Sequence, residues 1–200
     1  MEVRVGLEFD WFENHNKIVR PYVERIPLDY RIGAVHHVDG RQFDVDISYW
    51  RDRSPEARDD IYVKYWELVR EMAESGLFDI AAHLDLPKKL GFYPTSNLSR
   101  HIADALDAIH ASNMVVELNT AGFGKPCADA YPSLEILRQC HKREIPVTLS
   151  SDGHIPEHIL FEFERGLARL HEAGFSKIAR FRKRERFFEP LAEAVISNRG

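Results

Sequence analysis

The sequence has little cysteine, and this scarcity excludes two classes of small protein. Only Cys127 and Cys140 occur among the 200 residues, and their separation matches no metal-binding pair. Neither a disulfide framework nor a zinc ribbon is therefore expected. A pair of free thiols suits a reducing compartment, so we expect a cytoplasmic protein.

Long apolar runs and an excess of positive charge are also missing. The first residues enter an apolar alternation without a charged leader or a small-residue cleavage site, so we expect neither membrane insertion nor export. The 32 acidic residues outnumber the 27 basic ones, which disfavours a nucleic-acid partner. The basic run Arg180–Arg186 is explained as a solvated or phosphate-neutralising segment. Gly122–Lys125 lacks the spacing of a P-loop and is read as an ordinary loop.

What is present is enough apolar sequence for one compact α/β domain over residues 1–200. Hydrophobic residues make up 44% of the chain, and short apolar runs alternate with amphipathic stretches, as in βα units around a parallel sheet. Helices are expected around 61–72, 98–109, from Ser133 onward, and from Pro156 to just before Gly174. Parallel strands are expected at Val3–Phe9, Ile32–His36, Leu77–Ala82, Met114–Leu118, Pro146–Leu149 and Lys177–Phe181.

Residues able to bind metal follow the ends of most of these strands. In βα barrels the loops at that end of the sheet converge and build the active site. A mixed set of imidazoles and carboxylates, without thiolates, suits zinc, manganese or iron in a hydrolytic site. The candidates are Glu8, His36, His83, Asp152 and His154, with Glu117 and Asn119 close by.

Each of these residues also has a structural explanation. Glu8 can be a solvated carboxylate, and His83 a hydrogen-bonded structural histidine. Asp152 can be a turn residue before a helix. Histidines within the expected helices, His158 among them, are read as surface or packing residues. The coincidence across several strands is what favours a metal site.

The ordered motifs resemble the PHP (polymerase and histidinol phosphatase) family, and in particular its histidinol-phosphatases. They are Gly6-Leu-Glu8, Gly33-Ala-Val-His36, Ala82-His83-Leu-Asp85, Glu117-Leu-Asn-Thr-Ala-Gly122, Tyr131-Pro-Ser133, Ile145-Pro-Val-Thr-Leu149 and Ser150-Ser-Asp-Gly-His154. The resemblance implies a distorted (β/α)7 barrel of parallel strands with outer helices and a trinuclear metal centre. It also implies hydrolysis of a small phosphomonoester, L-histidinol phosphate, in histidine biosynthesis.

One departure from the family pattern limits what the resemblance implies. Family members begin with a His-x-His strand and a further histidine ligand upstream of the Glu motif, whereas no His-x-His occurs in these residues. We therefore expect a barrel that lacks its first βα units. By resemblance Glu8, His36 and His83 complete one metal's protein ligands, while Asp152 and His154 belong to the other two.

Several functions stay open at this stage. The leading one is a metal-dependent phosphatase, impaired by the missing ligands, with Lys88, Lys89 and Lys125 as candidate substrate-binding cations. A second is a non-catalytic metal-binding or regulatory module of the same fold. A third is a nuclease-like or amidohydrolase-like hydrolase, which the acidic chain disfavours. The oligomeric state is left undetermined by the sequence.

Overall fold

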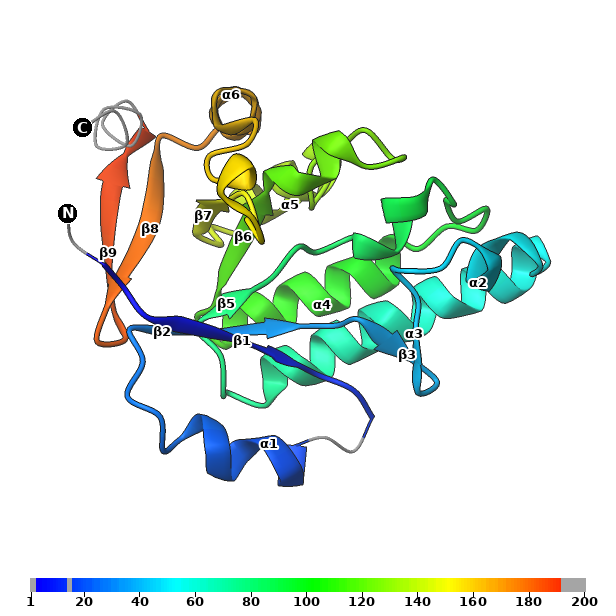
Figure 1. Ribbon diagram of the computed structural model, residues 1–200, viewed down its shortest axis with the longest axis horizontal. Coiled ribbons are helices and arrows are strands. Elements are labelled where there is room, and N and C mark those ends of the chain that lie inside the picture. The colour runs from blue at the N-terminus through cyan, green and yellow to red at the C-terminus, as the bar shows by residue number, and fades with distance from the viewer. Residues whose placement is uncertain (1–2, 14–15, 192–200) are drawn as a thin grey trace.

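The computed structural model describes residues 3–13 and 16–191, and its centre is a five-stranded parallel sheet (Figure 1). The strands lie side by side in chain order, as expected when each βα unit adds its strand next to the last. The parallel α/β architecture is therefore confirmed for five of the six expected strands. They are β1 (Gly6–Asp10), β2 (Tyr30–Ala34), β5 (Ile80–Ala81), β6 (Val115–Asn119) and β7 (Val147–Ser150).

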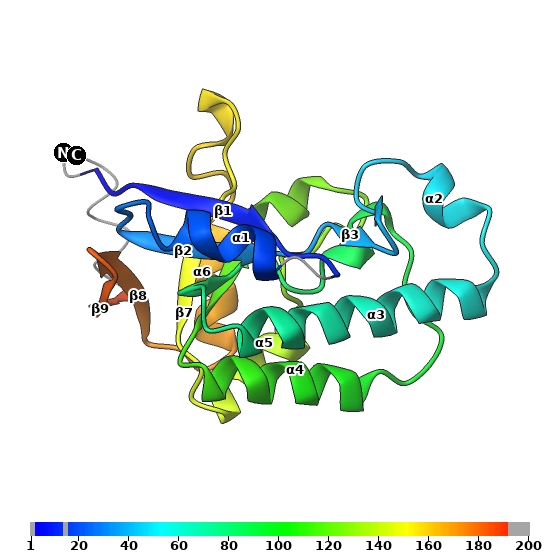
Figure 2. The same cartoon turned by 90° about the horizontal axis from the view of Figure 1, so that it is seen from below.

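Long helices cover the sheet, and α3 and α4 run side by side (Figure 2). The Ser54 side chain accepts a hydrogen bond from Ala57 N–H at 3.3 Å at the start of α3, and Gly76 adopts φ +66° just past its end. None of the described helices is long and apolar enough to cross a bilayer. The α-helices are α1 (Asn16–Val23), α2 (Ser48–Arg51), α3 (Pro55–Glu74), α4 (Ser99–Ala111), α5 (Leu134–Lys142) and α6 (Phe163–Glu172).

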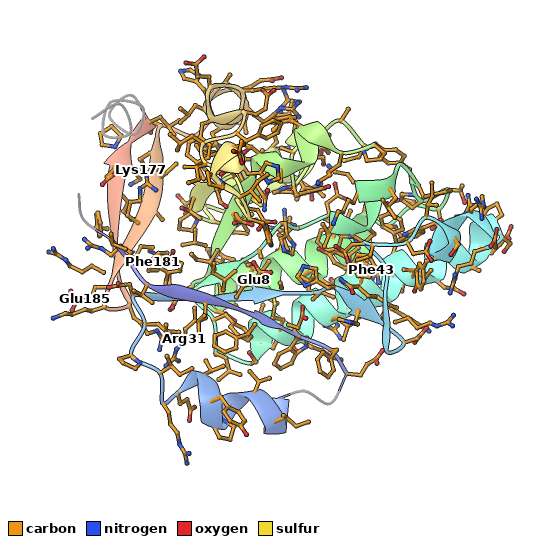
Figure 3. All side chains as sticks on the ribbon, viewed as in Figure 1. Glu8, Arg31, Phe43, Lys177, Phe181 and Glu185 are labelled. Carbon is orange, nitrogen blue, oxygen red and sulfur yellow. The ribbon has the colours of Figure 1, made fainter. Side chains whose placement is uncertain are left out.

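A short hairpin after β2 ties the loop that carries His36 to the core. It consists of β3 (His37–Val38) and β4 (Arg41–Gln42), and Phe43 N–H donates to the carbonyl of His36 at 3.1 Å. The Phe43 ring is fully buried (Figure 3), and the indole N–H of Trp50 donates to the Phe43 carbonyl at 2.7 Å. This packing holds the backbone of His36 beside the sheet.

The sixth expected strand is a correction. Residues Lys177–Arg182 form β8, which pairs antiparallel with β9 (Glu185–Pro190) in a separate two-stranded sheet. The turn between them places Lys183 at φ +49° and Arg184 at φ +66°. Two successive residues of positive φ are typical of a tight hairpin, which reverses the chain instead of leading into a crossover.

The helix expected from Pro156 is also shorter than the sequence indicated. A 3-10 turn covers Pro156–His158, and α6 begins only at Phe163. Leu160 and Glu162 adopt φ +61° and +54°, which interrupts a right-handed helix. The expected C-terminal stop is correct, because Gly174 follows α6 at φ +103°.

Candidate metal centre

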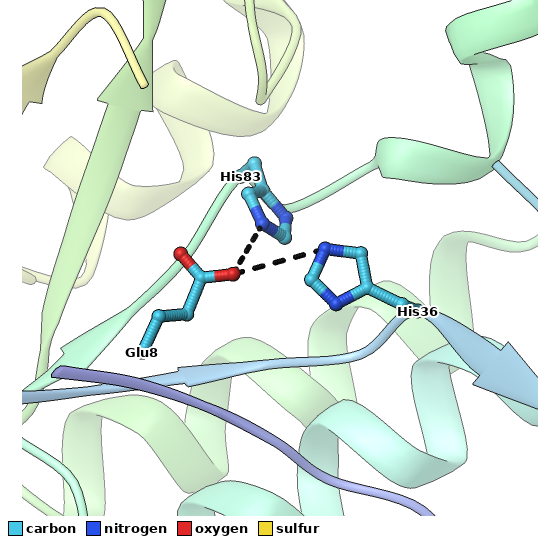
Figure 4. Close-up of side chains that lie close together, drawn as sticks. All are labelled: Glu8, His36 and His83. Atoms are coloured by element: carbon cyan, nitrogen blue, oxygen red, sulfur yellow. Dashed lines mark hydrogen bonds and ion pairs between the residues drawn. The ribbon is translucent and has the colours of Figure 1, made fainter. Parts of the chain in front are cut away.

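Three strands bring Glu8, His36 and His83 to one point (Figure 4). Glu8 lies within β1, while His36 and His83 each come two residues after the end of their strands, β2 and β5. One ligand atom from each of the three residues lies within 4.8 Å of the other two. Residues far apart in sequence therefore meet because parallel strands end at a common edge.

Two separations within this cluster are close to those between the ligands of a tetrahedral metal ion. Glu8 Oε1 lies 3.4 Å from His83 Nε2 and 3.8 Å from His36 Nε2. Ligands at zinc bond lengths of 2.0–2.2 Å in a tetrahedron are about 3.4 Å apart. One carboxylate oxygen and two imidazole nitrogens are also a donor set that zinc, manganese and iron accept. The residues present therefore fit a divalent ion.

Asp10 fixes the orientation of the His36 ring. Its carboxylate contacts Nδ1 of His36, so that Nδ1–H donates to Asp10 and Nε2 is left to face Glu8. This hydrogen bond lowers the pKa of Asp10. A carboxylate behind a metal-binding histidine is the usual arrangement for selecting the ring tautomer. We did not single out Asp10 in the sequence, although its position two residues after Glu8 places both on one face of the strand.

His83 is buried and surrounded by carboxylates. Burial opposes its protonation, but Glu8, Glu117 and Asp152 outweigh burial and raise the pKa of His83 to about 9. Burial also opposes the ionisation of Glu8, but His83 and His36 outweigh burial and lower the pKa of Glu8. The Nδ1 atom of His83 is buried without a hydrogen-bond partner in the described chain, while Nε2 faces Glu8.

Glu117 holds the backbone of His83 through a hydrogen bond. Its Oε2 accepts the backbone N–H of His83 at 2.8 Å and a hydrogen bond from Asn119 Nδ2 at 3.3 Å. Burial raises the pKa of Glu117. The contact holds the backbone of His83 at φ +22°, an unusual value for a non-glycine residue. Glu117 is thus placed to position a ligand residue.

The two other predicted ligands, Asp152 and His154, line the same cavity but stand outside the three-residue cluster. Asp152 is close enough for its charge to act on His83 and Glu117. His154 has 79% of its side chain exposed, and its Nδ1–H donates to the Asp152 carbonyl at 2.9 Å. The cavity measures about 540 Å³ and is also lined by Asp44, Leu86, Lys89, Ala121, Gly124, Lys125, Tyr131, Ser151, His158 and Phe161.

The three candidate cations have different surroundings. Lys89 and Lys125 line the cavity, and Lys89 Nζ lies 2.7 Å from Asp44 Oδ2. Lys88 instead is buried, with its Nζ 2.8 Å from carboxylates of both Asp85 and Asp129. The substrate-binding role of Lys88 stays a prediction, and two carboxylates balance its charge in the interior. His158, which we read as a surface residue, also lines the cavity, because the helix expected there is broken.

Fold and site together define an α/β protein with a histidine and carboxylate cluster at the carboxyl edge of a parallel sheet. The PHP domain profile matches residues 1–121. A probable histidinol-phosphatase from Deinococcus radiodurans is 34% identical over 185 residues, which cover 92% of this chain and 70% of the relative. The chain belongs to the PHP family.

More distant relatives agree with this assignment. A probable histidinol-phosphatase from Schizosaccharomyces pombe is 20% identical, with 92% of this chain and 63% of the relative covered. The crystal structure of histidinol phosphate phosphatase from Lactococcus lactis, complexed with zinc, L-histidinol and phosphate, superposes with a TM-score of 0.77. Its identity is 18%, and the match covers 94% of this chain and 72% of that one. At this identity the likeness shows a common fold.

Proposed function

We propose that this chain carries a metal-dependent phosphomonoesterase site whose substrate is L-histidinol phosphate. The observation that carries the proposal is the Glu8, His36 and His83 cluster, which suits a divalent ion and opens into a cavity lined by two lysines. The choice of substrate is inferred from relatives that are named probable histidinol-phosphatases. The activity belongs to histidine biosynthesis, and we place it in the cytoplasm.

Under this proposal Glu8, His36 and His83 hold a zinc, manganese or iron ion, and Asp152 and His154 serve further ions in the same cavity. A divalent ion supplies Lewis acidity, which polarises a phosphoryl oxygen and makes a nearby water more acidic. The protein contributes the orientation of the donors, since Asp10 keeps the His36 proton on Nδ1 and Glu117 holds the His83 backbone. No protein nucleophile is required.

The cavity supplies charge for the phosphate as well. Lys89 and Lys125 both line it, and an ammonium group near the reacting phosphoryl group stabilises the negative charge that develops there. Burial opposes ionisation of Asp44, but Lys89 outweighs it and lowers the pKa of Asp44. This pair fixes the Lys89 ammonium at the cavity wall, and Lys125 is the second phosphate-binding candidate.

A second candidate function is a metal-binding module of the same fold without catalysis. This function is favoured because the described residues form one group of three candidate ligands. A single ion cannot clamp both the attacking and the leaving oxygen of an in-line displacement. We therefore expect slow phosphate release by these 200 residues.

Phosphate release from L-histidinol phosphate in the presence of zinc or manganese tests the proposal. The Glu8→Gln variant removes a ligand charge, whereas His110→Ala removes an exposed histidine at the end of α4. We expect activity in the wild type and His110→Ala and a loss of at least tenfold in Glu8→Gln. Metal uptake with no turnover in any variant favours the non-catalytic module. Turnover that is equal in Glu8→Gln and the wild type excludes this site.

A further inference from the structure

A second cavity, of about 620 Å³, lies at the opposite end of the sheet from the metal centre. It sits between the connection that follows α1 and the turn of the β8–β9 hairpin. Figure 3 shows Arg31 at the start of β2, on the side of that connection. The residues that line the cavity are Val5, Glu24, Arg25, Ile26, Pro27, Leu28, Asp29, Arg31, Lys183 and Arg184.

Arg31 is the unusual member of this lining. Its residue surface is only 8% exposed, and its Nε is buried without a hydrogen-bond partner in residues 3–13 and 16–191. The backbone N–H of Arg31 donates to Asp79 Oδ2 at 2.8 Å. Burial and the nearby Arg184 lower the pKa of Arg31. Asp79 and Glu24 attract the charge of Arg31 and partly offset this lowering. Its buried Nε still lacks an acceptor within the described residues, and a bound anion would supply one.

The acidic groups around the cavity already have other partners. Both carboxylate oxygens of Asp29 accept backbone N–H groups, from Val5 at 2.9 Å and from Lys183 at 2.8 Å. Asp79 receives the bidentate guanidinium of Arg184, at 3.1 and 2.8 Å. The remaining lining acid, Glu24, pairs with Arg20 at 3.1 Å. These carboxylates are thus held by other donors.

The cationic groups are positioned by the fold. The tight turn fixes Lys183 and Arg184, and Arg184 N–H donates to the carbonyl of Asp29 at 2.8 Å. Lys183 and Arg25 are exposed at the rim. Asp79 neutralises Arg184, but the other three lining cations, Arg25, Arg31 and Lys183, still outnumber the two lining carboxylates. Part of the basic run Arg180–Arg186, the turn residues Lys183 and Arg184, therefore lines this cavity.

We propose that this cavity binds the phosphoryl group of a small phosphorylated molecule, with Arg31 at its base and Arg25 and Lys183 at its rim. Guanidinium groups form paired hydrogen bonds to phosphoryl oxygens. The apolar residues Val5, Ile26 and Leu28 provide contacts for an organic part, and the volume lies within the range of about 300–1,000 Å³ that small ligands occupy. Arg31 lies near the start of β2 and His36 follows the end of that strand, five residues on or roughly 16 Å of extended chain, so the site is separate from the metal centre.

The phosphoryl group can come from free phosphate or from a phosphorylated metabolite, and two probes separate these sources. The isotope-labelled full chain is titrated with inorganic phosphate and with adenosine monophosphate at constant ionic strength, and amide shifts are followed by NMR. We expect saturable shifts in residues 24–31 and 183–184 with both probes. Tighter binding of the nucleotide indicates that the apolar lining contributes, and equal binding indicates a site for the phosphoryl group alone.

Variants decide whether these side chains form the site. Arg25→Ala/Lys183→Ala removes two exposed rim cations, and Arg51→Ala/Lys142→Ala removes two exposed cations elsewhere. We expect at least tenfold weaker binding in the first variant, unchanged binding in the second, and unchanged phosphatase activity in both. Arg31→Met should abolish the shifts, with its folding checked by circular dichroism. Shifts that follow ionic strength only, that are confined to the metal cavity, or that persist unchanged in the rim variant would overturn the proposal.

Discussion

The carboxylate of Asp10 contacts Nδ1 of His36, and this places the opposite ring nitrogen 3.8 Å from Glu8 Oε1. Asp10 ends β1 and His36 follows the neighbouring strand β2 by two residues, so the register of β1 on β2 determines the tautomer of a candidate metal ligand. Loss of such a supporting carboxylate costs about 10–100-fold in metal affinity.

We therefore predict that Asp10→Ala weakens zinc binding by about 10–100-fold without removing a direct ligand. Competition with a chromophoric chelator measures the change. Asp52→Ala, at an exposed position beyond α2, serves as the matched control and should bind like the wild type. Equal affinity in Asp10→Ala and the control would show that the contact does not orient His36 for metal.

Metal binding should release a proton from His83. The pKa of His83 is raised from 6.5 to about 9 in the metal-free protein, so its ring is protonated at pH 7, whereas a metal binds the neutral ring. Affinity should therefore rise about tenfold per pH unit from pH 7 and level off near pH 9. Calorimetry at pH 7 in two buffers of different ionisation enthalpy measures the proton, and identical heats in both buffers would contradict the assignment.

The raised pKa of His83 should make the metal-free protein less stable as the pH rises. Because the folded pKa of His83 lies above its unfolded value, the contribution of the protonated ring is fully present below about pH 6.5. This contribution is lost as the pH rises through about 9. Urea unfolding in a chelator at pH 6 and pH 9 measures it, and His83→Gln should lose this part of the pH dependence.

Lys88 should matter for stability. Its buried ammonium lies between Asp85 and Asp129, and removing one partner of a buried ion pair typically costs about 3–5 kcal/mol. We predict a loss of that size for Lys88→Met in urea unfolding. Lys142→Ala, at an exposed position, should stay within about 0.5 kcal/mol of the wild type. A small effect of Lys88→Met would mean that the two carboxylates find other partners.

The free edge of β1 predicts self-association. Within the described residues β1 pairs only with β2, and Val3 and Val5 nearby are 68% and 57% exposed. An unpaired edge with apolar side chains accepts strands from other chains, and a charged residue there prevents this. Val3→Lys should lower the association of concentrated protein measured by light scattering, while Lys142→Ala should not.

The sequence predicted best what depends on local pattern. Apolar runs located five parallel strands, and Gly76 and Gly174 marked the ends of two helices. The sequence predicted less well what depends on backbone reversals, because the turn at Lys183 and the positive φ of Glu162 lack glycine.

In the candidate site, too, local pattern could be predicted from the sequence and contacts between elements could not. The convergence of Glu8, His36 and His83 could be predicted because side chains at the ends of parallel strands meet at one edge. Asp10 and the burial of Lys88 could not, because both depend on which side chains meet across elements. Pairing of that kind is set by register and packing, which a single sequence does not display.

Anomalous X-ray scattering at the zinc absorption edge, from crystals grown with zinc, tests the metal centre most directly. We predict a strong peak between Glu8 Oε1, His36 Nε2 and His83 Nε2, at about 2.0–2.2 Å from each of these atoms. In crystals of His83→Ala that peak should be lost or strongly reduced. A wild-type map with no peak among these three atoms, at a zinc concentration that saturates other sites, would contradict the account.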